Sequence, residues 1–186
     1  MFEDDRPDEQ LIALAVDLLS KAGRDGDAEA HLWRAFEKAP SLELYRRLCK
    51  AAGPAARDKA IERLQSRLAR EKRSAWHFTA DLLVSILIEE KQFEKAWINV
   101  REYGASEGLK QRLAQASEAT HPREALMVYA ARVDQMAQLG GDDSYAEAVA
   151  LIGRMACLRG VSEHSAYLAD VKARFGRKRN FMKLLA

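Results

Sequence analysis

Four basic side chains that could bind an acidic partner recur at helical spacing between residues 59 and 70. They are Lys59, Arg63, Arg67 and Arg70. Because they are three or four residues apart, a helix places them in one stripe, opposite an apolar face with Ile61, Leu64 and Leu68. Such a stripe suits the phosphates of nucleic acid or the carboxylates of a protein. The interpretation that we favour is a solvated helix face with ion pairs along the helix.

A second basic cluster lies in the C-terminal segment KARFGRKRNFMKLLA. Its central cations are Arg177, Lys178 and Arg179. Two aromatic residues are few for stacking on bases, and a net charge of +2 gives no general attraction to nucleic acid. We therefore predict that this segment is a terminal helix that closes a helical stack. The buried face of that helix is expected to contain Phe175, Phe181, Leu184 and Leu185.

Residues that could hold a metal or catalyse a reaction are dispersed along the chain. They are His31, His77, His121, His164, Cys49 and Cys157. Neither cysteine has a partner at the spacing of zinc ligands, and two reduced thiols are the simplest interpretation. No G-x-S-x-G motif is present, and the pair Gly140-Gly141 lacks the lysine of a phosphate-binding loop. We expect no catalytic, metal or cofactor site and no enzymatic activity.

The sequence also bears on localisation. The first residues, MFEDDRPDEQ, are acidic, whereas a secretory leader starts with positive charge. The longest apolar run, LLVSILI, is far shorter than the roughly 20 residues that cross a bilayer. We therefore expect a cytoplasmic protein without a membrane partner.

Helical periodicity runs through the whole chain. Prolines number only four, no segment alternates strictly as a half-buried strand does, and alanine, leucine, arginine and glutamate are abundant. Breaks such as Gly53-Pro54, His121-Pro122 and Gly140-Gly141 predict about ten or eleven helices joined by short turns, which pack antiparallel. Gly153 lies inside one predicted helix, and we attribute it to a close approach of two helices.

A repeat is visible in these helices. Residues 12–40 resemble a tetratricopeptide unit, with Ala28, Leu32, Ala35 and Pro40 at its second-helix positions. Similar patterns surround Ala60, which is 32 residues after Ala28, and Ala96, which is 36 residues after Ala60. Both spacings are close to the tetratricopeptide repeat length of about 34 residues. We predict an all-α fold in which antiparallel helical hairpins stack as a tetratricopeptide-like α-solenoid, with a closed bundle as the alternative. Trp33 and Trp97 are expected to pack between repeats.

The second half carries a more specific pattern. It consists of HPREALMVYAARVDQMAQLGGDDSYAEAVALIGRMACLRG followed by YLADVKARFGRKRNFMKLL. This pattern resembles the C-terminal helical region of bacterial SWIM zinc-finger proteins and related bacterial domains of unknown function. The resemblance covers residues 80–186 well and implies the helical fold and the order of helices, but no activity. A SWIM finger needs a Cys-x-Cys pair, which this chain lacks, so a finger would have to lie on a separately encoded protein.

These observations predict one helical-repeat domain over residues 1–186, with weaker repeats in 1–72 and a family-like half in 73–186. The leading hypothesis is a non-enzymatic scaffold that binds a protein or peptide in a concave groove. The groove residues predicted for it are Arg46, Arg47, Trp76 and His77. The alternative is a nucleic-acid-associated protein that uses the stripe and the C-terminal cluster. A third hypothesis is an enzyme whose pocket is assembled from distant residues. The sequence specifies neither the partner nor the oligomeric state.

Overall fold

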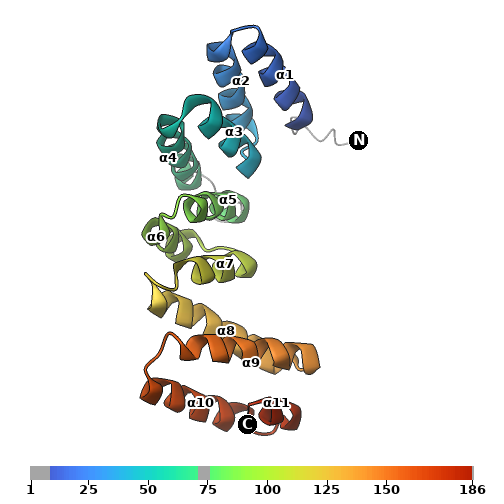
Figure 1. Ribbon diagram of the computed structural model, residues 1–186, viewed down its shortest axis with the longest axis vertical. Coiled ribbons are helices and arrows are strands. Elements are labelled where there is room, and N and C mark those ends of the chain that lie inside the picture. The colour runs from blue at the N-terminus through green and yellow to red at the C-terminus, as the bar shows by residue number, and fades with distance from the viewer. Residues whose placement is uncertain (1–8, 71–75, 186) are drawn as a thin grey trace. The chain divides into compact units, whose positions relative to one another are not determined.

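A computed structural model of the chain describes residues 9–70 and 76–185, apart from the side chains of Trp76 and His77 (Figure 1). Over these residues the chain forms eleven α-helices and no strand. The predicted all-α fold of about ten or eleven helices is therefore confirmed. No helix in the described ranges combines the length and the apolar character that crossing a membrane requires.

The chain divides into two compact units, Met1–Ser106 and Glu107–Ala186, here called unit 1 and unit 2. The sequence predicts a single domain over residues 1–186 whose character changes between residues 72 and 73. The division lies further along because the helices on either side of that point, α4 (Pro54–Arg70) and α5 (Trp76–Glu89), pack on each other within unit 1.

Unit 1 is a succession of helices in which each packs on the next. Its remaining helices are α1 (Glu9–Lys21), α2 (Asp25–Lys38), α3 (Leu42–Ala52) and α6 (Phe93–Tyr103). The small residues at the predicted repeat positions, Ala28, Ala60 and Ala96, are buried, so neighbouring helices approach closely there. Trp33 and Trp97 are buried as well.

The acidic end of α5 joins three helices of unit 1. The Tyr45 hydroxyl donates a hydrogen bond of 2.7 Å to Glu90 Oε1, and Arg57 Nε lies 2.7 Å from Glu90 Oε2. Burial raises the pKa of Tyr45, and the hydrogen bond to Glu90 raises it further. The Tyr45 hydroxyl and the Glu90 carboxylate thus connect α3, α4 and the end of α5.

Unit 2 contains the other five helices. They are α7 (Glu107–Ser117), α8 (Pro122–Leu139), α9 (Asp142–Ala156), α10 (Val161–Phe175) and α11 (Arg179–Leu184). The boundaries at Pro122 and at Gly140-Gly141 follow the predicted breaks. Gly140 has a φ of 78°, and a Cβ there would lie 3.3 Å from the Tyr145 hydroxyl, so this turn requires glycine. The explanation given for Gly153 is wrong, because an added Cβ would meet nothing within 4 Å.

The last helix, α11, packs on α9 and α10. Phe181 is fully buried and stacks on Tyr145 with ring centroids 5.2 Å apart, while Phe175 meets Phe181 edge-on at 6.2 Å. The prediction that Leu184 is buried is wrong, because its side chain is 49% exposed. It lines a hollow together with Asp142 and Asp143 at the start of α9.

Glu118 links three helices of unit 2. Its Oε1 accepts a hydrogen bond of 2.5 Å from the Tyr129 hydroxyl of α8 and another from Arg154 Nε of α9. The second carboxylate oxygen accepts from Arg154 Nη2 at 3.2 Å. Burial by itself would raise the pKa of Glu118, but the hydrogen bonds from Arg154 and Tyr129 outweigh it and hold the pKa below its ordinary value of 4.5.

This lowered pKa predicts a loss of stability in acid. The folded state favours the charged carboxylate, so its contribution is present above pH 4.5 and is lost as the pH falls through the folded-state pKa. We expect the free energy of unfolding, from urea denaturation, to fall below about pH 4.5. The fall should be smaller in Glu118→Gln, which has no charge to lose. An identical acid profile in both proteins would contradict this expectation.

Candidate functional site

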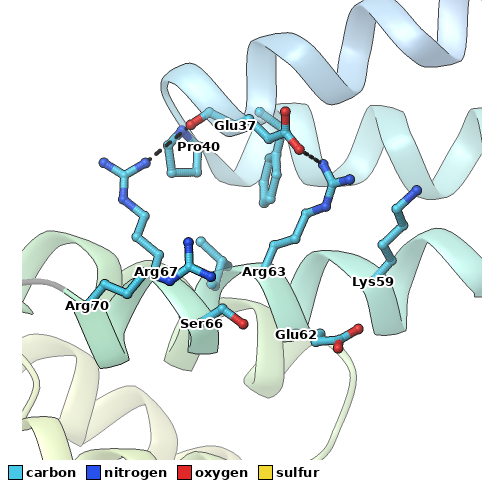
Figure 2. Close-up of a pocket in the computed structure, with 10 residues that line it drawn as sticks. Glu37, Pro40, Lys59, Glu62, Arg63, Ser66, Arg67 and Arg70 are labelled. Atoms are coloured by element: carbon cyan, nitrogen blue, oxygen red, sulfur yellow. Dashed lines mark hydrogen bonds and ion pairs between the residues drawn. The ribbon is translucent and has the colours of Figure 1, made fainter.

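A hollow of about 730 Å³ lies between α2 and α4 in unit 1 (Figure 2). We call it the α2/α4 groove. It is lined by three buried apolar residues, Phe36, Pro40 and Leu64, and by polar residues, which are Glu37, Glu62, Ser66 and the four cations of the stripe. Both helices pack on α3, which holds them at the spacing that leaves the hollow between them.

The local sequence explains why α2 ends at the groove. Pro40 lacks a backbone N–H and cannot extend the helix, and Ser41 starts α3 by accepting a hydrogen bond of 3.2 Å from the Leu44 backbone N–H. The last turn of α2 therefore presents the Glu37 side chain and backbone carbonyl groups to α4. These negative groups face the basic stripe.

Two arginines of the stripe are engaged with α2. Arg63 forms an ion pair with the Glu37 carboxylate, and its guanidinium lies 4.4 Å from the centroid of the Trp33 ring. Arg67 Nη1 donates to the backbone oxygen of Glu37 at 3.4 Å. Figure 2 shows both side chains reaching from α4 across to the end of α2. These contacts join the two walls of the groove.

The other two cations lie at the ends of the stripe. Lys59 is exposed, with its Nζ 4.8 Å from the centroid of the Trp33 ring. Arg70 is also exposed, and no hydrogen bond or ion pair joins it to any residue in the described ranges. Both side chains can therefore give their N–H donors to a ligand without breaking an ion pair within the described structure.

The prediction that the stripe lies opposite the apolar face needs correction. Leu64, a member of that face, lines the same hollow as the cations. Each step of four residues rotates the side chain about 40° around the helix, so Arg67 has turned toward the Leu64 side. The cations therefore border the apolar core, and this is why the hollow that they line also contains apolar residues.

The groove that we predicted from the first helices of the repeats has a different character. Arg46 pairs with Glu89 of α5, Nε to Oε2 at 3.2 Å, and this hydrogen bond and charge raise the pKa of Arg46. Arg47 Nε lies 3.0 Å from Glu43 Oε1, one turn earlier on α3. The side chains of Trp76 and His77 lie outside the described part of the structure. Both arginines are thus already paired with carboxylates.

The C-terminal cluster belongs to unit 2. Lys178 Nζ donates to the backbone oxygen of Gln138 at 3.3 Å, which ties the start of α11 to the end of α8. Arg177 and Arg179 are exposed. Within this cluster, Lys178 therefore makes a contact that holds α11 against α8.

Sequence reasoning found the four cations but missed the residues that shape their surroundings. Glu37 is 26 residues from Arg63 in sequence and Trp33 is 30 residues from it, so no local pattern indicates these contacts. The Pro40 that we assigned to the end of a repeat was the available signal, since it marks where α2 ends.

The groove could bind an anionic ligand, because four cationic side chains line it. Among the described residues, no three histidine, cysteine, aspartate or glutamate side chains are placed to hold a metal ion together. No protein-family model, curated protein or solved structure matches this chain.

Proposed function

We propose that this chain is a non-enzymatic, tetratricopeptide-like scaffold that acts in the cytoplasm and binds an acidic segment of a protein partner in the α2/α4 groove. The observation that carries the proposal is the convergence of Lys59, Arg63, Arg67 and Arg70 on one hollow. Ion pairs formed at the edge of a hollow are less screened than those on a flat surface. The proposal moves the binding surface from Arg46 and Arg47 on α3 to the stripe on α4, where Lys59 and Arg70 form no ion pair with any described residue.

Two features of the groove favour a peptide over nucleic acid. Glu37 and Glu62 lie among the cations, and these carboxylates would repel an unbroken row of phosphates. Trp33, the aromatic ring beneath Lys59 and Arg63, is only 7% exposed, so it offers no face on which a base could stack. A peptide can place its acidic groups at the cations and neutral residues elsewhere. The resemblance of the second half to SWIM-associated helical regions is compatible with a scaffold and adds no ligand.

Substitution of one cation tests the proposal. We expect Arg70→Glu to weaken binding of a fluorescein-labelled (Glu-Gly-Ser-Gly)3 peptide, whose glutamates are separated by neutral residues, by about tenfold, since a charge-assisted hydrogen bond is replaced by repulsion. Fluorescence anisotropy at 50 and 150 mM NaCl measures the dissociation constant. The matched control is Arg112→Glu, which makes the same charge change at an exposed arginine of α7 and should alter affinity less than twofold.

Two outcomes of the same titrations would contradict the proposal. If neither this peptide nor a single-stranded oligonucleotide binds at 50 mM NaCl, the groove is not a binding site for anionic chains. If the oligonucleotide binds more tightly and loses affinity in Arg70→Glu, the chain is a nucleic-acid-binding protein. Circular dichroism of each variant shows whether the helices are retained.

A further inference from the structure

We propose that the first half of α10, residues 161–168, opens transiently within unit 2 while the second half of the same helix stays docked. We call this segment the α10 strap. The inference is independent of the proposed function, because α10 belongs to unit 2 and the α2/α4 groove belongs to unit 1. It follows from the little apolar surface that the strap buries, from the polar groups beneath it, and from the anchors that follow it.

The strap buries little apolar surface. Of the fifteen residues of α10, Val171 is the one that is buried, and it lies beyond the strap. The neighbouring helix α9 has the same length and buries four. Val161 at the start of the strap is exposed, and Gly160 before it has no side chain with which to cap the helix. A segment with so few buried apolar contacts is expected to open more readily than the rest of its unit.

Polar groups without partners lie beneath the strap. The Tyr167 hydroxyl and His164 Nδ1 have essentially no solvent-accessible surface and no hydrogen-bond partner among the described residues. The same is true of Oδ1 of Asp134 on α8. Burial, followed by the negative charge of Asp134, raises the pKa of Tyr167 to about 12. Because a buried polar group without a partner destabilises the state that buries it, the closed strap is penalised, and opening lets water bind these groups.

Arg159, just before the strap, adds to this penalty. Its side chain is only 10% exposed, and its guanidinium stacks on the Tyr167 ring at 4.0 Å from the centroid. Stacking on the ring is favourable, but it gives Nε and Nη1 no acceptor, and both are buried without a hydrogen bond to any described residue. Oε1 of Glu163 lies 3.7 Å from Nε, too far for a hydrogen bond. Opening of the strap would hydrate Arg159 together with Tyr167.

The second half of α10 is held by three contacts. Val171 is fully buried, and the Phe175 ring meets Phe181 of α11 edge-on at 6.2 Å. Arg174 Nη1 donates a hydrogen bond of 2.6 Å to Oδ2 of Asp134, which joins this half to α8. The opening motion is therefore expected to end between the strap and Val171.

Amide hydrogen exchange of the full chain, followed by NMR at neutral pH, tests the proposal. The informative amides are those of residues 165–168, since the first amides of any helix have no partner within it. We expect them to exchange about tenfold faster than the central amides of α8 and α9. In Tyr167→Phe they should exchange about tenfold more slowly than in the unmodified protein, because the closed strap no longer buries a hydroxyl without a partner.

Two further variants serve as controls. Tyr129→Phe makes the same substitution on α8, but the Tyr129 hydroxyl donates to Glu118 Oε1 at 2.5 Å, so its loss should not slow exchange anywhere in unit 2. Arg174→Gln removes the charge that pairs with Asp134 and should extend fast exchange into the second half of α10.

Two results would overturn the inference. If residues 165–168 exchanged as slowly as the centres of α8 and α9, the strap would not open separately. If Tyr167→Phe left their exchange unchanged or made it faster, the buried hydroxyl would not be what destabilises the closed strap. Neither result bears on peptide binding in the α2/α4 groove.

Discussion

Phe181→Ala is expected to lower the free energy of unfolding by about 3–5 kcal/mol, the usual cost of removing a buried phenylalanine ring. Phe181 has no exposed surface, and it packs between Tyr145 of α9 and Phe175 at the end of α10. It is the only buried residue of the six in α11. Without its ring, α11 has little apolar surface to hold it on α9. Denaturant unfolding followed by far-UV circular dichroism measures the loss.

The control for this prediction lies on the same helix. Leu184 is 49% exposed, so Leu184→Ala should cost well under half as much. Hydrogen exchange adds a local readout, since the amides of α11 and the last turns of α10 should lose protection in Phe181→Ala. Equal effects of the two substitutions would mean that Phe181 does not anchor the terminal helix.

Glu118→Ala is expected to destabilise the protein by about 2–3 kcal/mol. The substitution leaves the hydroxyl of Tyr129, a residue with no exposed surface, without its hydrogen-bond acceptor, and it removes the partner of Arg154. Most of the cost comes from the tyrosine, because the Arg154 side chain is 43% exposed and water can solvate it. Urea denaturation at neutral pH measures the change.

A second ion pair between the same two helices serves as the comparison. Arg132 of α8 and Glu147 of α9 form two hydrogen bonds of 2.7 and 3.1 Å, but the Glu147 side chain is 41% exposed and bonds no buried hydroxyl. Glu147→Ala should therefore cost less than about 1 kcal/mol. If Glu147→Ala proved as damaging as Glu118→Ala, the burial of the tyrosine hydroxyl would not be the decisive factor.

The same arrangement occurs in both units. In each, a buried tyrosine hydroxyl and an arginine bind one glutamate that follows a helix: Tyr45 and Arg57 with Glu90, and Tyr129 and Arg154 with Glu118. The sequence did not indicate either group, because the residues are 11 to 45 positions apart and share no spacing. Their contacts depend on how three helices meet.

The sequence by itself determined the helical architecture. Proline and glycine positions end helices through local backbone restrictions, and apolar residues at helical spacing define which face of each helix is buried. For this reason Pro122 and Gly140 marked boundaries correctly, and Ala28, Ala60 and Ala96 are in the core. The resemblance of residues 80–186 to SWIM-associated helical regions stays a prediction.

Tertiary structure alone decided which charged residues are available for binding. Arg46, Arg63 and Arg70 are all arginines in a basic stretch, and nothing local distinguishes them. Packing places Glu89 beside Arg46 and Glu37 beside Arg63, while Arg70 points into the α2/α4 groove. The physical reason is that ion pairing depends on a few ångströms between helices distant in sequence, whereas helix formation depends on neighbours within four residues.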